Sequence, residues 1–249
     1  MVIVMCCTNN WNHYMLVDIY ALLSTNDVKK LYLFFEGDAP KELENIKEMF
    51  DTEIIPIDYT NIFYKFIDKN CPNLNTIFSN ATIVRLFLTK VIDEEKILYL
   101  DTDAIVIDDI SELWNTNMDD YYIAGVKDEH LLNFIDYIDV MGIPEDSINA
   151  GITLMNLKKI KEDGLDDTFI YEVNNVKYRF IDQDILNKFC CEKILFIDNQ
   201  YNSSPVCGFS NHPKIVHYTF EKSDWIKRHP NNHYWYDWEE KYKEEFNID

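Results

Sequence analysis

Short runs of apolar residues alternate along the chain with segments in which apolar residues recur at helical spacing. The runs are typical of buried strands, and the spaced segments are typical of amphipathic helices. This alternation predicts an α/β fold, and the lack of a repeat, a low-complexity tract or a linker predicts a single domain. We expect strands at residues 2–7, 31–35, 53–57, 96–100, 121–126 and 215–218, an apolar segment with a small-residue turn at 148–157, and helices at 11–24, 40–50, 80–91 and 182–189.

Three of these helices carry local signals. Pro40 stands near the first turn of the helix at 40–50, where proline is tolerated. Within 80–91 the apolar residues fall on one helical face. Asp182 stands where an N-cap is expected, because its carboxylate can accept a hydrogen bond from the first turn.

Residues 229–246 combine aromatic and charged side chains. Tyr234, Trp238 and Tyr242 recur at helical spacing and share one face. A membrane-surface anchor would carry an excess of Lys and Arg, whereas this segment is rich in acidic residues. We therefore expect a helix docked on the core, in a C-terminal tail of residues 226–249 that follows a main domain of residues 1–225.

Two carboxylates lie one residue apart in the apolar stretch LYLDTDAIV. In an extended segment the side chains of Asp101 and Asp103 point to the same side, so they repel unless a cation, a shared proton or water is near. On a solvated turn, in contrast, Asp is common and carries no chemistry. The pair directly follows the strand expected at 96–100, and ligands of open α/β sheets bind beyond the carboxyl ends of strands. This position favours a functional site.

The acidic composition narrows the classes of ligand. The 249 residues include 23 Lys and Arg against 44 Asp and Glu, for a formal net charge of -21. This charge argues against nucleic acid as a partner and allows at most peripheral membrane contact. An anionic substrate would need locally gathered positive charge or a metal ion. No apolar run reaches the roughly 20 residues of a membrane span, and no charged region precedes the apolar start, so we expect a cytoplasmic protein.

Several common motifs are absent from the sequence. The six cysteines include no C-x-x-C, which argues against a zinc knuckle or a redox pair. The six glycines form neither G-x-G-x-x-G nor G-x-x-x-x-G-K-[ST], and no G-x-S-x-G is present. If phosphates are bound, a glycine-rich loop does not hold them.

A divalent metal ion suits the pair of carboxylates. Carboxylate oxygens are the preferred ligands of Mg²⁺ and Mn²⁺, an imidazole is acceptable to Mn²⁺, and substrate phosphates commonly fill the remaining positions. His217, in the strand expected at 215–218, is a candidate third ligand beside Asp101 and Asp103. Taken alone, a histidine beside an apolar strand is more often a hydrogen-bonded structural residue.

Six segments together resemble a known family. In their order and spacing, these segments resemble those of the retaining glycosyltransferases of family eight. They are VIVMCCTNNWNHY, the arginine of ATIVRLFL, LYLDTDAIV, NAGITLMNL, DQDILN and IVHYTFEKSDW. The resemblance covers about residues 1–225. It implies a GT-A fold, which is a Rossmann-like domain with a central mixed sheet flanked by helices. It also implies a UDP-sugar donor with Mn²⁺, or Mg²⁺ in its place.

The resemblance assigns roles to individual residues. Asp101, Asp103 and His217 match the metal ligands, and Asp128 falls near the pocket for donor sugar and acceptor. Gln183 would face the anomeric carbon of the donor sugar. The other matched positions are Thr8 and Asn10 at the uracil and ribose, Arg85, Asn149 and Asp182 at the donor sugar, and Thr102 and Ala150 beside them.

Some matched residues have structural alternatives, and two departures affect donor binding. Arg85 could be a surface guanidinium on an apolar helix, and Asn149 could serve the turn before Gly151. Thr8 stands where many members have Asp. The family's last block has Gly and Lys at the diphosphate, where this chain has Phe220 and Ser223. Lys222, one residue earlier, is our candidate for the role of the lysine.

The resemblance implies transfer of a hexose, glucose or galactose, from a UDP-sugar to a glycan, a lipid-linked saccharide or a glycoprotein, in the cytoplasm or at the inner face of the cell membrane. Because the amide of Gln183 is a poor nucleophile, we expect front-face attack of the acceptor. One alternative is a haloacid-dehalogenase-type phosphohydrolase, with Asp101 as nucleophile and Asp103 as acid and base. Phe220 and Ser223 motivate another, a catalytically silent sugar-nucleotide-binding protein.

Overall fold

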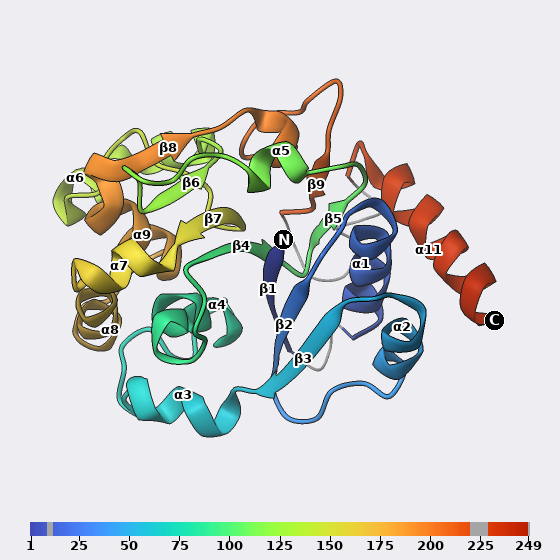
Figure 1. Ribbon diagram of the computed structural model, residues 1–249. Helices are drawn as coiled ribbons and strands as arrows, with labels where there is room; N and C mark the ends of the chain where they lie inside the picture. The colour runs from blue at the N-terminus through green and yellow to red at the C-terminus, as the bar shows by residue number, and fades with distance from the viewer. Residues whose placement is uncertain (9–11, 220–228, 249) are drawn as a thin grey trace.

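A seven-stranded mixed sheet forms the centre of the molecule, which we describe from a computed structural model (Figure 1). The structure describes residues 1–8, 12–219 and 229–248. The strand order is β3-β2-β1-β4-β7-β6-β8, and β5 and β9 form a second, two-stranded sheet. The strands are β1 Val2–Cys7, β2 Lys30–Phe35, β3 Glu53–Asp58, β4 Lys96–Asp101, β5 Ala104–Val106, β6 Ile123–Gly125, β7 Ile152–Asn156, β8 Ile194–Phe196 and β9 Ile215–His217.

The sheet changes direction at β4. Strands β3, β2, β1 and β4 run parallel to one another, whereas β7 is antiparallel to both β4 and β6, and β6 and β8 are parallel. The α/β fold with a central mixed sheet is thus confirmed. In the small sheet, β5 pairs antiparallel with β9, and Ala104 lies opposite His217. This pairing brings His217 next to the turn that follows β4.

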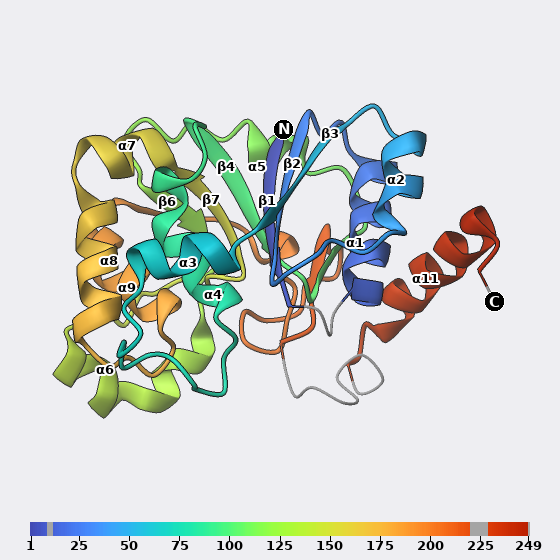
Figure 2. The ribbon, with the colours of Figure 1, turned by 90° about the horizontal axis from the view of Figure 1, so that it is seen from below.

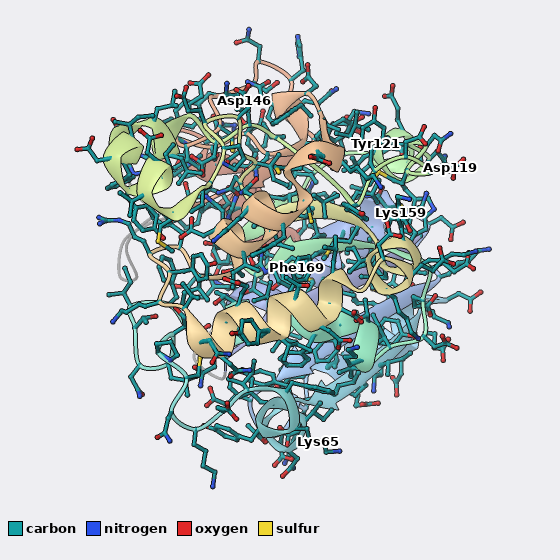
Figure 3. The ribbon with its side chains drawn as sticks, turned by 90° about the vertical axis from the view of Figure 1, so that its left-hand side faces the viewer. Lys65, Asp119, Tyr121, Asp146, Lys159 and Phe169 are labelled. Atoms are coloured by element: carbon teal, nitrogen blue, oxygen red, sulfur yellow. The ribbon has the colours of Figure 1, made fainter. Side chains whose placement is uncertain are left out.

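Helices cover both faces of the sheet, so the central strands are apolar on both sides. Residues of β1 alternate between two core clusters, with Ile3 and Met5 in one and Val4 and Cys6 in the other. Helices α1, α2 and α11 lie on the first face and α3, α4, α7, α8 and α9 on the second (Figure 2). On the second face Phe169 of α8 points into the core, where it is 1% exposed, while Lys65 lies at the periphery (Figure 3).

The helices of the described residues are α-helices and short 3-10 helices. The α-helices are α1 Asn12–Thr25, α2 Leu43–Met49, α3 Thr60–Phe66, α4 Ala81–Val84, α5 Ser111–Trp114, α6 Ile135–Met141, α7 Leu157–Glu162, α8 Leu165–Asn175, α9 Asp182–Cys190 and α11 Asn232–Phe246, and the 3-10 helices are η2 Arg85–Lys90, η3 Glu129–Phe134, η4 Cys191–Lys193 and η5 Asn199–Tyr201. In the part of the chain that the structure describes, no helix is long and apolar enough to cross a membrane.

Three local expectations were wrong. The helix expected at 80–91 is divided into α4 and η2, with non-helical dihedral angles at Phe87. Residues on every side of this segment are buried, so tertiary packing overrides the amphipathic pattern. Helix α2 begins at Leu43, after a turn that contains Pro40. Asp182 is the first residue of α9 and not its N-cap, which is Ile181, because the Asp182 carboxylate turns toward Arg85.

Helix α11 packs across α1 on the first face of the sheet. The ring of Tyr20 lies 6.0 Å from that of Trp238 and 5.7 Å from that of Tyr242. Trp235 and Tyr242 are buried, and Tyr234 and Trp238 are partly buried against the core. The buried face is thus wider than the sequence spacing predicts, since it includes Trp235.

Candidate functional site

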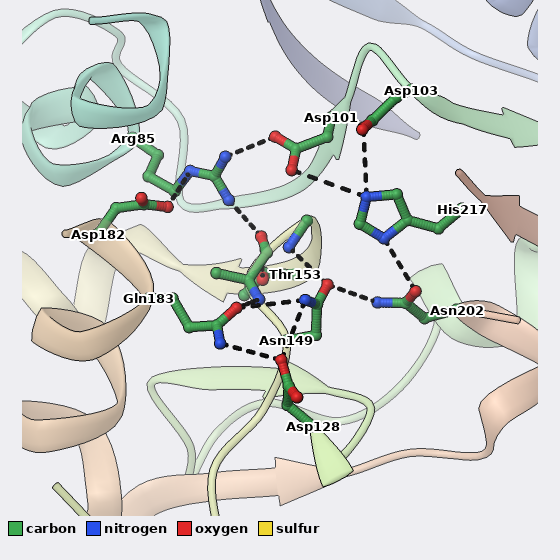
Figure 4. Close-up of polar contacts among 12 residues, drawn as sticks. Arg85, Asp101, Asp103, Asp128, Asn149, Thr153, Asp182, Gln183, Asn202 and His217 are labelled. Carbon is green, nitrogen blue, oxygen red and sulfur yellow. Dashed lines mark hydrogen bonds and ion pairs between the residues drawn. The ribbon is translucent and has the colours of Figure 1, made fainter. Parts of the chain in front are cut away.

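Polar side chains from several segments that are distant in sequence meet beyond the carboxyl end of β4 (Figure 4). Asp101 is the last residue of β4, Asp103 lies in the turn before β5, and His217 ends β9. The Nε2 atom of His217 lies 3.2 Å from Asp103 Oδ1 and 4.0 Å from Asp101 Oδ2. A ligand atom from each residue lies within 4.8 Å of the other two. The three residues singled out in the sequence as metal ligands are therefore brought together.

The orientation of His217 is fixed by a neighbour that the sequence did not reveal. Asn202 Oδ1 lies 3.0 Å from His217 Nδ1, and the Asn202 amide nitrogen donates to Asn149 Oδ1 at 3.0 Å. Because this amide nitrogen is engaged as a donor, its oxygen accepts the Nδ1 proton of the imidazole. The Nε2 atom therefore faces the two carboxylates, as is typical of a metal-binding histidine with an outer partner.

The charges around this group favour a bound cation. Burial by itself lowers the pKa of His217, but the nearby carboxylate of Asp103 outweighs burial and raises it. Burial raises the pKa of Asp101 despite the neighbouring guanidinium of Arg85. The raised pKa of His217 reflects the negative charge of the two carboxylates, whereas that of Asp101 reflects mainly its burial, so a cation beside them would be stabilised by their charge. A divalent metal is such a cation.

The space beside the three ligands has no room for another side chain. A methyl group built at Gly151 would lie 2.2 Å from His217 Cε1 and 2.8 Å from Asp101 Oδ2. The glycine before β7 therefore lets the backbone approach the ligand group closely. Two carboxylates and one imidazole are a donor set that suits Mn²⁺, so the residues present fit the expected metal.

Arg85 is a buried cation that joins two of the acidic residues. It is 2% exposed, and its Nη2 donates to Asp101 Oδ1 at 2.5 Å. Its Nε lies 2.9 Å from Asp182 Oδ2, and its Nη1 donates to the carbonyl oxygen of Ala150. The guanidinium carbon lies 3.9 Å from the ring centre of Tyr99. Arg85 is thus no surface residue, and it links β4 to the start of α9.

Asp182 experiences opposing influences. Burial raises its pKa, Arg85 lowers it and Asp101 raises it again, and together they bring the pKa to about 7. Arg85, Asp101, Asp103, Asp182 and His217 together are called the charged side of the site below. Three carboxylates against one guanidinium and one imidazole give this side an excess of negative charge.

Neutral amides dominate the opposite side. Gln183 donates from Nε2 to Asp128 Oδ2 at 3.0 Å, and its Oε1 accepts from Asn149 Nδ2 at 3.2 Å and from the Ala150 amide at 3.1 Å. Asn149 Nδ2 also lies 3.3 Å from Asp128 Oδ2, and Asn149 Oδ1 accepts from the Gly151 amide. Asp128, Asn149, Gln183 and Asn202 are called the amide side below.

Asp128 and one further residue, Asn187, hold the amide side in place, and Asn187 has no local sequence signal. Asp128 Oδ1 caps η3 through the amides of the first turn, so its second oxygen remains for Gln183. Asn187 of α9 accepts from the Ile148 amide at 2.8 Å and donates to its carbonyl oxygen at 2.9 Å. This pair of bonds anchors the segment that carries Asn149. Like Asn202, Asn187 is recognised only when distant segments are brought together.

Some of the remaining predicted positions lie among the residues that the structure describes, and the others lie outside them. Thr8 follows β1 at its carboxyl end, beside the pair formed by Cys6 and Asp101. Thr102 lies between the two carboxylates and is partly exposed. Ala150 contributes backbone atoms to both sides of the site. Asn10, Phe220, Lys222 and Ser223 lie outside the described residues.

Known structures and sequences define the class of protein. The galactosyltransferase LgtC, solved with donor and acceptor sugar analogues, superposes with a TM-score of 0.75 over 97% of this chain and 96% of that chain, at 20% sequence identity. The fold is that of a GT-A glycosyltransferase. The model of glycosyl transferase family 8 matches residues 2–226. The chain belongs to glycosyltransferase family 8.

Individual relatives match shorter stretches. A protein of Haemophilus influenzae that is named as a glycosyltransferase is 38% identical over 146 residues, which are 55% of this chain and 43% of that protein. The lipopolysaccharide 1,2-glucosyltransferase of Escherichia coli is 27% identical over 143 residues, 53% of this chain and 41% of the relative. The matched parts are thus less than half the length of either relative.

Proposed function

We propose that this protein is a retaining glycosyltransferase that transfers a hexose, glucose or galactose, from a UDP-sugar to a glycan acceptor with Mn²⁺, or Mg²⁺ in its place. One observation carries the proposal. At the carboxyl end of β4, three residues that can bind a divalent metal lie beside the amide side of the site. Family membership and the hexosyltransferase names of two similar proteins support it. The acceptor is a polysaccharide, a lipid-linked saccharide at the inner face of the cell membrane, or a glycoprotein.

The charged side would bind the diphosphate end of the donor. Asp101, Asp103 and His217 would hold the metal, which would stabilise the negative charge that develops on the leaving UDP. Arg85 fixes the Asp101 carboxylate through a bond of 2.5 Å. Arg85 also forms an ion pair with Asp182, the first residue of α9. It therefore holds the start of α9 next to the metal ligands.

The amide side would bind the sugar. Asp128, Asn149 and Gln183 present amide and carboxylate groups that can exchange hydrogen bonds with hydroxyl groups. Their bonds to one another fix their rotamers before a ligand arrives, so little side-chain entropy is lost on binding. Buried hydroxyl recognition of this kind discriminates strongly between sugars, because a missing partner leaves a buried polar group unpaired.

We further propose front-face attack of the acceptor. Gln183 Oε1 already accepts two hydrogen bonds, which makes an inherently weak nucleophile weaker still. In this step the acceptor oxygen bonds to the anomeric carbon on the face from which UDP departs, the carbon–oxygen bond to the diphosphate breaks, and the acceptor proton passes to the departing phosphate oxygen. Gln183 acts as a stabilising dipole.

Mass spectrometry with a slow donor tests front-face attack. It should detect no glycosylated side chain, and such an adduct would refute front-face attack.

The function is tested with a panel of UDP-sugars. We expect one UDP-hexose to raise the melting temperature and to be slowly hydrolysed, with both effects dependent on Mn²⁺ and removed by EDTA. Binding without hydrolysis or transfer would instead support the silent sugar-nucleotide-binding protein. Rapid hydrolysis of a generic phosphate ester, abolished by Asp101→Asn, would support the phosphohydrolase. The absence of a metal-dependent response to all uridine nucleotides would refute the proposed donor class.

A further inference from the structure

The turn before α9 has an unusual backbone conformation. Ile181 has φ 40° and ψ −97°, although it is β-branched and only 1% exposed. Positive φ is disfavoured for β-branched residues, and strained residues persist only where the surrounding structure holds them. The two residues that follow, Asp182 and Gln183, contact the charged side and the amide side respectively. The strained residue therefore directly precedes two site residues.

A buried carboxylate and a tyrosine hold this turn from outside the site. Asp184, fully buried in α9, accepts from the Phe180 amide at 2.8 Å and from the Tyr137 hydroxyl at 2.6 Å. The Tyr137 oxygen in turn accepts from the Arg179 amide at 2.8 Å. The backbone on the N-terminal side of Ile181 is thus bound to α6 by one hydrogen bond and to α9 by another, and a third bond joins Tyr137 to Asp184.

Aromatic packing supports the same contact. The ring of Phe134 at the end of η3 lies 5.3 Å from that of Phe180, and the Arg179 guanidinium lies 4.2 Å from the centre of the Phe134 ring. The η3–α6 segment, residues 129–141, is therefore joined to the turn at Tyr137 and at Phe134. It is also joined to α9 at its beginning, where Asp128 binds Gln183 at 3.0 Å. Attachment at both ends makes the segment and the turn one unit.

We propose that Tyr137 and Asp184 are positioning residues, which hold the strained turn at Ile181 and thereby fix where Asp182 and Gln183 lie. The inference rests on the proposed function for its effect on turnover, but the attachment itself can be measured without it. Asp184 acts here through its geometry as a hydrogen-bond acceptor, because both of its bonds are made by one carboxylate oxygen to neutral donors.

The central test is Tyr137→Phe, which removes one oxygen atom and keeps the ring. The displaced turn should lower kcat by about 10- to 100-fold, because small misplacements of reacting groups are costly. The KM for the UDP-sugar should rise less than kcat falls, since the metal ligands proposed to hold the diphosphate are not touched. Tyr122→Phe is the matched control: it removes a hydroxyl that donates to Asp163 at 2.7 Å, remote from the turn. It should leave kcat and KM unchanged.

Substitutions at Asp184 separate geometry from charge. In Asp184→Asn the amide oxygen can still accept from Phe180 and Tyr137, so we expect kcat close to the wild-type value. Asp184→Ala should reproduce the loss seen in Tyr137→Phe. If Asp184→Asn is as inactive as Asp184→Ala, the charge of Asp184 is what matters and the positioning role is refuted.

Hydrogen exchange tests the attachment independently of catalysis. The Arg179 amide donates to Tyr137 and the Phe180 amide to Asp184, so Arg179 should lose protection in Tyr137→Phe and Phe180 in Asp184→Ala. Both amides should stay protected in Tyr122→Phe. Unchanged protection in Tyr137→Phe would overturn the inference. If the wild-type protein turns over no UDP-sugar, the proposed function fails, whereas the exchange data still decide whether these residues hold the turn.

Discussion

The two sides of the site are held by different interactions. The charged side has ion pairs around Arg85, with three carboxylates close together and a deficit of positive charge. On the amide side, in contrast, each of the amides has donors and acceptors engaged with its neighbours. The charged side should therefore depend on a cation and on pH, while the amide side should keep its geometry without either. Substitutions on the two sides separate these behaviours.

The largest effect is expected at the metal ligands. Asp103→Asn removes the carboxylate nearest to His217, and metal stabilisation of the leaving group should be lost with it. We expect transfer to fall about 1,000-fold, equivalent to about 4 kcal/mol of transition-state stabilisation. The melting temperature should no longer respond to Mn²⁺. Asp120→Asn, at an exposed site, is the control for the loss of one negative charge. Activity retained in Asp103→Asn would rule out the assigned ligand.

Loss of Arg85 should destabilise the fold itself. Arg85→Met leaves Asp101 and Asp182 without their shared partner, and breaking a buried ion pair typically costs about 3–5 kcal/mol. Urea unfolding measures this loss, and Lys65→Met at an exposed site of α3 is the control. Equal stability of Arg85→Met and the wild type would show that the guanidinium does not support the charged side.

The same variant should depend on pH in a defined direction. The pKa of Asp182 is about 7 in the folded protein and near 3.8 when unfolded, so the folded state binds more protons between these values. Stability from this group is therefore present at low pH and is lost as pH rises toward 7. Without Arg85 the pKa of Asp182 should rise further, so the deficit of Arg85→Met should be larger at pH 8 than at pH 5.

Local patterns predicted the strands and the charged side better than the amide side. The apolar runs gave β1 to β4 because these strands are buried on both faces, but β5 and β8, with three residues each, were not predicted. Asp101 and Asp103 are separated by one residue in the sequence, so their pairing is local. The helix at 80–91 was wrong because burial on all sides removes the amphipathic signal.

The amide side is built from contacts between distant segments. Asn202 binds His217, 15 residues away, and Asn149, 53 residues away. Asn187 and Ile148 are separated by 39 residues. A single asparagine in a polar stretch has no periodicity that could indicate such contacts, so only the fold identifies it.

Asn202 joins the two sides and tests whether they are independent. Asn202→Ala removes the partner of His217 Nδ1 and a donor to Asn149. Loss of an outer partner of a metal ligand typically lowers metal affinity or activity by about 10- to 100-fold. Calorimetry with Mn²⁺ and kinetics with the UDP-sugar should both show this loss. Asn175→Ala, at an exposed position in α8, is the control.

The outcome distinguishes two kinds of coupling. If Asn202→Ala weakens Mn²⁺ binding without changing the KM for the donor, Asn202 serves the charged side alone. If both change, the hydrogen-bond chain transmits the geometry of the imidazole to the amide side. Wild-type metal affinity in this variant would contradict the role of Asn202 in orienting His217.

A separate effect of pH is expected at His229, a buried residue outside the charged side. Its ring packs against those of Tyr218 and Phe209, and burial, with a contribution from His217, lowers its pKa to about 4 from 6.5. The unfolded chain therefore binds the extra proton first, and stability from the neutral ring is lost as pH falls from 6.5 to 4. We expect a loss of about 3 kcal/mol over this range, since one pKa unit corresponds to about 1.4 kcal/mol. His229→Gln should lack this component, so the difference in unfolding free energy between wild type and variant should narrow on acidification. A constant difference from pH 8 to pH 4 would mean that the imidazole titrates alike in the folded and unfolded states, and it would contradict the effect of burial on the pKa of His229.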